Sequence, residues 1–217
     1  MKKKWSIAIL ASCLSVLGIV APISLVEANT ELPTTTIEPL SLEEKTALEN
    51  GDIVVTGTEG QYLARMVIDA SVDNLWAVLT DYNNFIDFLP NIVSSSVIES
   101  EGNSYLVEQV SKQRVLLFDI ESRLLTENIQ TENQRIDFSL VDGDLSQFQG
   151  YWTIEPFASS VEGEAPQLLV TQSVEVQPAR GTPENLFYDI FKNALEKTLT
   201  AIRDEVDRRE SDSFSNQ

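Results

Sequence analysis

The 217-residue sequence contains no histidine and only one cysteine, and both shortages limit its chemistry. Without imidazole, the usual general base, the Ser-His and Cys-His nucleophile pairs and imidazole metal sites are excluded. Because Cys13 is the only cysteine, no disulfide forms within the chain, and the hydrophobic core must hold the fold by itself. We therefore predict no metal and no cofactor. An enzyme built from this chain would depend on carboxylates, Lys, Arg or Tyr.

Basic residues are scarce as well. There are 15 Lys and Arg against 34 Asp and Glu, which gives a net charge of −19 at pH 7. Such a charge repels nucleic-acid phosphates and anionic lipid head groups, and no basic stripe in the sequence offsets it. We therefore expect no nucleic-acid partner, while a transient membrane contact stays open. A well-solvated surface is enough to explain the excess of acidic residues.

The first 28 residues differ in composition from the rest. After three lysines, the chain is almost wholly apolar from Trp5 to Val26, and Val26-Glu27-Ala28 has the small-residue pattern of a signal-peptidase site. We therefore expect residues 1–28 to be a signal peptide and the protein to be exported, to the periplasm or another extracytoplasmic compartment. Two alternatives stay open: a lipoprotein cleaved before Cys13, and an uncleaved membrane anchor, for which about twenty apolar residues suffice.

Residues 29–52 are predicted to be a linker with one short helix. The linker part holds two prolines and a run of threonines, and Ser41-Leu42-Glu43-Glu44 is a capping box that begins a helix. From Ile53 onward the apolar residues recur at every second position, which predicts strands. We assign residues 53–209 to one globular domain and residues 210–217 to a disordered tail.

Five segments of this domain alternate between apolar and charged residues, as strands of an antiparallel sheet with one wetted face do. In the first of them, Met66 and Ile68 share the apolar face, while Arg65 lies on the wetted one. The other four apolar faces contain Leu116, Phe118, Ile120 and Leu124; Ile136, Phe138 and Leu140; Trp152 and Ile154; and Leu168, Val170, Val174 and Val176. Ser122 and Gln172 interrupt two of these faces with polar side chains.

A sheet with one apolar face needs a cover, and two regions supply helices. Thr182-Pro183 is a helix start, after which apolar residues recur at helical spacing and predict a long helix that ends at Arg209. Between the first two strands, Leu75 to Ile92 (LWAVLTDYNNFIDFLPNI) predicts two short helices, which are separated at Asp81–Asn84 and ended by Pro90. The predicted order is one strand, two short helices, a run of antiparallel strands and one long helix.

This order resembles the helix-grip fold of the START-like superfamily, also called SRPBCC, and within it the polyketide cyclase/dehydrase and coenzyme Q-binding START-like group. Three stretches carry the resemblance: Leu75 to Ile92, GDLSQFQGYWTIEP at 143–156, and the helix from Thr182. The resemblance covers roughly residues 53–206. It implies an α+β fold in which a curved antiparallel sheet wraps around the long C-terminal helix. It also implies an apolar cavity between sheet and helix, with the two short helices at one end.

On this resemblance we predict a ligand-binding site in the cavity. The predicted residues are Met66, Ile68, Phe85, Phe88, Leu89, Phe118, Ile120, Ser122, Phe138, Trp152, Val170, Gln172, Phe187 and Phe191. Phe85, Phe88 and Leu89 would lie at the cavity mouth, or would simply plug the end of the fold, since aromatic clusters are more often packing than ligand contacts. Ser122 or Gln172 would contact a polar group of the ligand, or would hold a buried water.

Three functions compete at this point. We favour a noncatalytic carrier or binding protein for an apolar small molecule, such as a quinone, an isoprenoid or a lipid. The first alternative is a cyclase- or dehydratase-type enzyme with Asp81 and Asp87 as candidate acid and base, although both residues also suit a turn or a solvated surface. The second alternative is an interaction module with a vestigial cavity, which would expose an apolar patch instead.

Overall fold

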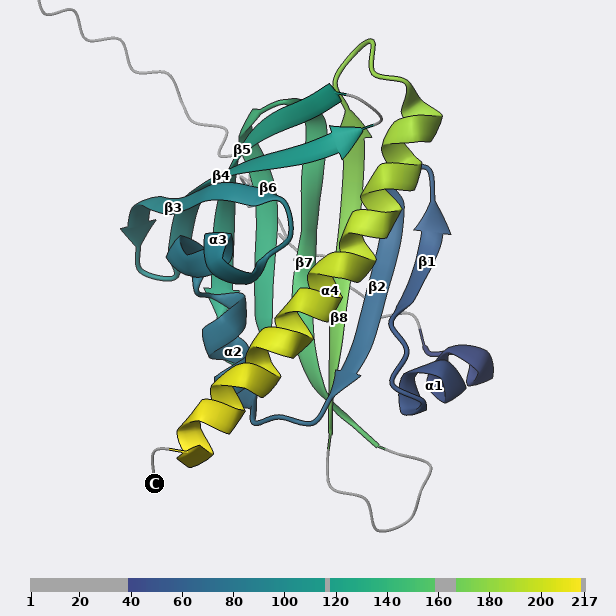
Figure 1. The fold of residues 1–217 in the computed structure, drawn as a ribbon, viewed down its shortest axis with the longest axis vertical. Coiled ribbons are helices and arrows are strands. Elements are labelled where there is room, and N and C mark those ends of the chain that lie inside the picture. Colours follow the sequence, from purple (N-terminus) through teal and green to yellow (C-terminus); the bar gives the residue numbers. More distant parts are fainter. Residues whose placement is uncertain (1–38, 116–117, 159–166, 216–217) are drawn as a thin grey trace, which may run out of the picture. The chain divides into compact units, whose positions relative to one another are not determined.

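A curved antiparallel sheet of eight strands and one long helix dominate the fold (Figure 1). The computed structural model describes residues 39–115, 118–158 and 167–215. The strands are β1 (Val54–Thr58), β2 (Gln61–Ile68), β3 (Ile92–Glu101), β4 (Ser104–Val115), β5 (Phe118–Thr131), β6 (Arg135–Gly143), β7 (Leu145–Phe157) and β8 (Gln167–Pro178). The helices are α1 (Leu42–Glu49), α2 (Val72–Leu79), α3 (Phe85–Phe88) and α4 (Glu184–Ser215), with a single 3-10 turn, η1 (Tyr82–Asn84).

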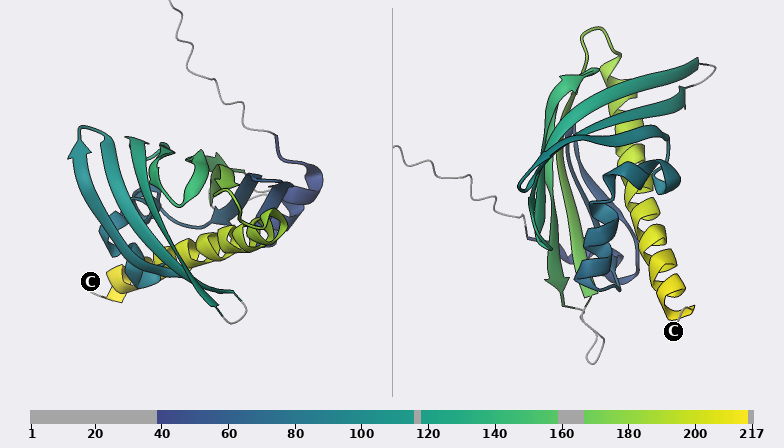
Figure 2. Two further views of the ribbon diagram at one scale, coloured as in Figure 1. Left: turned by 90° about the horizontal axis from the view of Figure 1, so that it is seen from above. Right: turned by 90° about the vertical axis from the view of Figure 1, so that its left-hand side faces the viewer.

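The helices α2, α3 and α4 lie on the concave side of the sheet, where α4 crosses the strands diagonally (Figures 1 and 2). The strand order is β1-β2-β8-β7-β6-β5-β4-β3, so β2 pairs with the last strand and β3 forms an edge. The connection from β2 to β3 therefore carries α2 and α3 from one end of the sheet to the other. This arrangement confirms the predicted α+β helix-grip fold, including the two short helices after the first core strand.

The sequence explains where the two short helices begin and end. Ser71 caps α2, because its hydroxyl accepts a hydrogen bond from the backbone N–H of Asn74 over 3.2 Å. The helix α3 stops before Pro90, and Leu89 already has an extended backbone, as the residue before a proline prefers. The break between α2 and α3 is η1, at the predicted position.

The main core lies between the sheet and the second half of α4. Ala64, Met66 and Val170 on β2 and β8 are completely buried, as are Leu199 and Val206 on α4. Complete burial of one side chain of this size contributes about 1.5–3 kcal/mol. In this part of the fold, direct packing of helix on sheet therefore holds the chain together.

The convex face of the sheet is not wetted throughout, which corrects the prediction for β2. The alternation places Arg65 on a wetted face, but the residue is only 2% exposed. The helix α1 covers it, and Arg65 Nη1 donates a hydrogen bond to Glu44 Oε1 over 2.8 Å. Leu48 of α1 completes a second, smaller core with Val67 and Leu169. The ion pair compensates for the cost of burying the guanidinium, and the local sequence pattern does not reveal this contact.

The C-terminal helix is longer than the sequence predicts. The helix α4 continues to Ser215, past the predicted end at Arg209, so residues 210–215 are helical and do not form the predicted disordered tail. Glu210 explains part of this extension. Its carboxylate accepts a hydrogen bond from Asn74 Nδ2 over 2.9 Å and so joins the end of α4 to α2.

The predictions for the N-terminal region concern residues that the structure does not describe. Residues 1–38, which include the predicted signal peptide and most of the linker, lie outside the described ranges. Among the helices within those ranges, none is both long and apolar enough to cross a membrane.

Candidate ligand cavity

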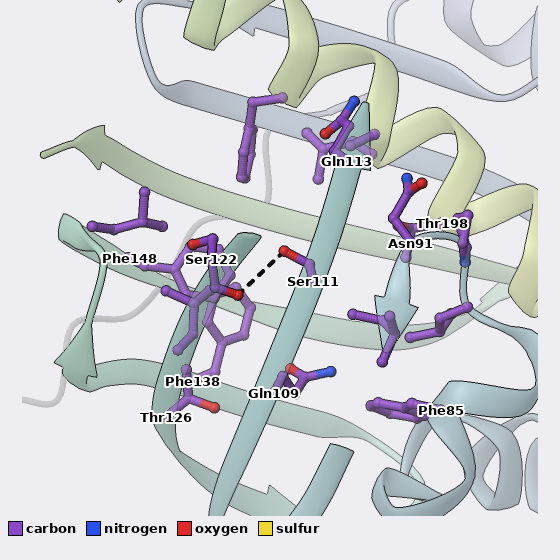
Figure 3. A pocket seen from close by; sticks show the side chains of 18 of the residues that line it. Phe85, Asn91, Gln109, Ser111, Gln113, Ser122, Thr126, Phe138, Phe148 and Thr198 are labelled. Atoms are coloured by element: carbon purple, nitrogen blue, oxygen red, sulfur yellow. Dashed lines mark hydrogen bonds between the residues drawn. The ribbon is translucent and has the colours of Figure 1, made fainter. Parts of the chain in front are cut away.

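A cavity of about 430 Å³ lies between the curved sheet and α4. Its walls come from α2, η1 and α3, from the inner faces of β3 to β8, and from α4 as far as Ile202 (Figure 3). Cavities that bind small molecules usually measure about 300–1,000 Å³. The space therefore suits one molecule of drug-like size.

One wall of the cavity is rich in aromatic rings. The ring centroids of Phe138 on β6 and Phe148 on β7 lie 4.9 Å apart, and Phe148 lies 6.4 Å from Phe191 on α4. Phe187, one turn earlier on α4, stacks against Phe191 at 5.8 Å. Trp152 also lines the cavity, and we call these five aromatic residues the aromatic wall. Such rings form a rigid apolar surface of the kind that buries most of a small ligand.

The neighbouring part of the cavity lining, from β4 and β5, carries several polar side chains beside the apolar Val107, Ile120 and Leu124. Its inward-facing polar side chains include Gln109, Ser111 and Gln113 on β4 and Ser122 and Thr126 on β5 (Figure 3). Asn128 on β5 also lines the cavity. Asn128 Nδ2 donates to Thr126 Oγ1 over 3.0 Å, and the Ser111 hydroxyl donates to the backbone carbonyl of Ser122 over 3.5 Å. We call the six polar residues the polar wall. It offers both donors and acceptors of hydrogen bonds without any net charge.

The described part of the cavity lining carries no charged side chain. No Asp, Glu, Lys or Arg is found among the lining residues that the structure describes. Tyr82 is ionisable, but burial raises the pKa of its hydroxyl to about 12, although a hydrogen bond from Gln130 Nε2 opposes the shift. Tyr82 is therefore neutral at physiological pH. In a chain with a net charge of −19, the acidic residues lie elsewhere.

Most of the residues predicted from the sequence do line the cavity. These are Phe85, Leu89, Ile120, Ser122, Phe138, Trp152, Gln172, Phe187 and Phe191. Met66, Ile68 and Val170 do not, because they are buried in the main core, where the helices pack directly on the sheet. Alternation identifies the inner face of a strand, but it does not show which part of that face a helix fills.

The aromatic residues of the two short helices divide between the two predicted roles. Phe85 and Leu89 line the cavity, whereas Phe88 packs against the main core and lies 5.7 Å from the guanidinium carbon of Arg209. Phe88 therefore plugs the end of the fold. Phe118 begins β5, but its side chain lies outside the described part of the chain.

The sequence analysis missed most of the polar wall. On β4, Gln109, Ser111 and Gln113 alternate with the charged residues Glu108 and Lys112, so neither face of this strand looks apolar. A signal was present, since one face is uncharged and the other is charged. On β5, Thr126 and Asn128 continue the inward series that Ser122 begins. An uncharged polar face beside a charged face is thus the pattern that marks this wall.

The two carboxylates considered for acid–base chemistry do not line the cavity. Asp81 accepts hydrogen bonds from Arg209 Nη2 and from Asn84 Nδ2, each over 2.7 Å. Asp87 is exposed on α3. Asp81 therefore joins the end of α2 to α4, and neither carboxylate lies where a bound molecule would meet it.

Comparison with known proteins identifies the family. A family model described as "Polyketide cyclase / dehydrase and lipid transport" matches residues 68–203, more than half of the chain. The chain belongs to this family. Proteins with the START-like fold bind apolar small molecules, and the cavity between sheet and helix is the feature of this member that suits such binding.

The individual proteins that resemble this chain share less than a third of their residues with it. The chain is 29% identical over 93 residues to the persistence and stress-resistance toxin PasT of Escherichia coli, a match that covers 42% of this chain and 56% of PasT. The chain thus spans about half the length of that relative. Its fold is similar to a STAR-related lipid transfer protein from Xanthomonas axonopodis, with a TM-score of 0.55 and 16% identity over 71% of this chain and 92% of the other. A START superfamily protein from Mycobacterium smegmatis gives a TM-score of 0.54 with 15% identity, over 73% and 99% of the two chains. At such identities the likeness shows the fold alone.

Proposed function

We propose that this protein binds and carries an uncharged apolar molecule, such as a quinone, an isoprenoid or a lipid, in the cavity beneath α4. The uncharged lining supports this proposal most directly. An ionised group buried without a partner of opposite charge is strongly disfavoured. None of the described lining residues supplies such a partner. A neutral molecule with apolar bulk and a few polar atoms meets no such penalty.

The volume of the cavity also favours an occupied state. At about 24 cal/mol per Å³, a dry and empty cavity of 430 Å³ would cost about 10 kcal/mol. That is as large as the about 5–15 kcal/mol that stabilises a whole domain. Water that is hydrogen-bonded to the polar wall reduces this free-energy cost. The rings of the aromatic wall recover their missing van der Waals contacts only when an apolar molecule is bound.

The same lining gives less support to a catalytic role. Acid–base catalysis requires a titratable group within hydrogen-bond reach of the reacting atoms. The described lining residues supply only Tyr82, whose pKa of about 12 keeps it protonated. Binding without chemistry is therefore the function that we propose.

We further propose that the protein works outside the cytoplasm. The support is the sequence of residues 1–28, with its basic start, its apolar segment and its Val26-Glu27-Ala28 site. A carrier in that compartment would protect an apolar molecule from water between membranes or proteins.

The proposal is tested on the full-length gene product, purified from the envelope fraction of its host. We expect native mass spectrometry to show one apolar molecule per chain, which organic extraction then recovers. The intact mass also locates the N-terminus, and a chain without residues 1–28 would support export. Cleavage before Cys13, with a lipid attached, or an uncleaved chain would instead support one of the two alternatives.

A matched pair of variants locates the binding site. Ala194→Trp fills the cavity from α4 and should lose the molecule, while Lys197→Trp on the exposed side of α4 should keep it. A wild-type protein that is always empty would contradict the carrier function. Equal occupancy in Ala194→Trp and wild type would show that the molecule binds somewhere else.

A further inference from the structure

Gln172 is a polar side chain in an otherwise apolar part of the sheet. It lies on β8 between Ala64 of β2 and Trp152 of β7, which are its partners in the two strand pairs. Its inward-facing neighbours on β8, Val170 and Val174, are buried in the main core. Gln172 itself is only 7% exposed and lines the cavity. Its side-chain amide can therefore meet only protein or the molecule that fills the cavity.

The amide oxygen of Gln172 has no donor. Within the described residues, Oε1 is buried and accepts no hydrogen bond. Buried polar groups in folded proteins nearly always have a partner, and each exception needs an explanation. The cavity provides one here, because a bound molecule with an O–H group could supply the missing donor.

We propose that the bound molecule carries a hydroxyl group that donates a hydrogen bond to Gln172 Oε1, while its apolar body packs on the aromatic wall. This inference rests on the proposed carrier function and narrows the class of ligand. Alcohols, phenols and quinols have such a donor, whereas quinones, ethers and hydrocarbons have none. An ammonium donor does not fit, since the described lining contains no carboxylate to neutralise it.

The position of Gln172 also favours an elongated ligand. The strands β8 and β5 are separated by β7 and β6. The strand register places Gln172 in line with Trp152, Ile136 and Gln130, and Asn128 of the polar wall lies two residues from Gln130 on β5. Gln172 and Asn128 are therefore about three strand spacings apart across the sheet. At about 4.8 Å per spacing, that is roughly 14 Å along the curved sheet. A linear chain with its hydroxyl at Gln172 would extend across the aromatic wall toward the polar wall.

The test uses three linear probes with the same carbon skeleton: farnesol, farnesyl methyl ether and farnesene. Binding to the purified protein is measured by isothermal titration calorimetry. We expect the wild type to bind farnesol at least about tenfold more tightly than the ether or the hydrocarbon, which corresponds to about 1.4 kcal/mol. Gln172→Met keeps the length of the side chain and removes the amide, so it should bind farnesol and its methyl ether equally. Gln149→Met, at an exposed position of β7, should keep the preference.

The outcomes separate this inference from the carrier function. If none of the three probes bound, the result would contradict the carrier function for isoprenoid chains. Equal binding of all three by the wild type, or a farnesol preference that persists in Gln172→Met, would overturn the role of Gln172 and leave the carrier function standing. The comparison of the three probes on the wild-type protein needs no variant, so it does not depend on whether Gln172→Met folds. We also expect ligand-free Gln172→Met to unfold at or above the wild-type Tm, because the substitution removes an unpaired buried amide.

Discussion

Gly150 lies in β7 opposite Val174 of β8, where two neighbouring groups leave no room for a side chain. A Cβ at this position would clash with the backbone carbonyl oxygen of Ser173 and would lie 2.8 Å from Phe138 Cζ. Phe138 belongs to the aromatic wall, and its ring packs against Phe148. The absence of a side chain at Gly150 therefore permits both the close pairing of β7 with β8 and the position of an aromatic ring in the cavity.

Replacement of this glycine should lower the stability of the whole domain. We expect Gly150→Ala to reduce the free energy of unfolding by about 1–3 kcal/mol, because overpacking forces the strand or the ring to move. Urea denaturation at pH 7 measures the change. Ser139→Ala, at an exposed position of the adjacent strand β6, should change stability by no more than about 0.5 kcal/mol. A Gly150→Ala variant as stable as the wild type would show that the backbone can relax here.

At the scale of single residues, the sequence predicted which side chains face inward better than it predicted whether they line the cavity or lie in the core. Phe138, Trp152 and Gln172 were identified because they stand on, or interrupt, an apolar strand face, and all three line the cavity. Met66 has the same pattern and lies in the core. The difference depends on how closely a helix approaches each part of the sheet, and that distance depends on residues far away in the chain.

At the scale of elements, the end of α4 is held to the two short helices by a group of charges. Glu205 is 8% exposed and accepts hydrogen bonds from Arg208 and Arg209, and Arg209 also donates to Asp81. The hydrogen bonds from Arg208 are the main cause that lowers the pKa of Glu205 to about 2, and those from Arg209 add to it. Burial opposes the shift. The ionised carboxylate therefore stabilises the folded chain.

The sign of this pKa shift predicts how stability depends on pH. Since the folded pKa of Glu205 is about 2 and its ordinary value is 4.5, its contribution is fully present above pH 4.5 and decreases as the pH falls toward 2. We expect Glu205→Gln to cost about 1–2 kcal/mol at pH 7, after solvent screening at the exposed Arg208 is allowed for. The difference from wild type should nearly vanish at pH 2.

Chemical denaturation of both proteins across this pH range makes the comparison. Asp212→Asn removes a carboxylate from an exposed ion pair with Arg208 and should cost less than about 0.5 kcal/mol at any pH. A difference between Glu205→Gln and wild type that stayed constant from pH 7 to pH 2 would contradict the role of the ionised carboxylate.

The elements themselves were largely predictable, and their partners were not. The cap at Ser71 and the stop at Pro90 are local signals, and both mark the ends of real helices. The capping box at Ser41 likewise predicted α1. Nothing near Glu44 in the sequence shows that its carboxylate also reaches Arg65 on β2. That contact exists only once the sheet has formed, and it explains why the wetted-face prediction for β2 was wrong.

At the scale of the whole molecule, the excess of negative charge should make stability depend on salt. A net charge of −19 brings repulsion that is stronger in the compact folded state than in the expanded unfolded chain. An ionic strength of 0.15 M reduces the Debye length to about 8 Å, compared with about 30 Å at 0.01 M. We therefore expect Tm at pH 7 to rise by about 2–4 °C over this range of NaCl, which corresponds to about 1 kcal/mol.

Differential scanning calorimetry at the two NaCl concentrations measures this shift. The same scans at pH 4.5, where many carboxylates are partly protonated, should show a smaller effect because the net charge is lower. A Tm at pH 7 that stayed constant or fell with added salt would show that local ion pairs, which salt weakens, outweigh the general repulsion.

The order of the strands has a consequence for how the chain folds during synthesis. Residues 61–68 of β2 pair with residues 168–175 of β8, so a strand made early must wait for one made more than a hundred residues later. At a synthesis rate of about 5–20 residues per second, that delay lasts roughly 5–20 s. In the meantime the meander from β3 to β6 can form, while one side of β2 offers unpaired N–H and C=O groups to other chains. The same pairing that closes the finished sheet therefore leaves each nascent copy open to aggregation until its last strand leaves the ribosome.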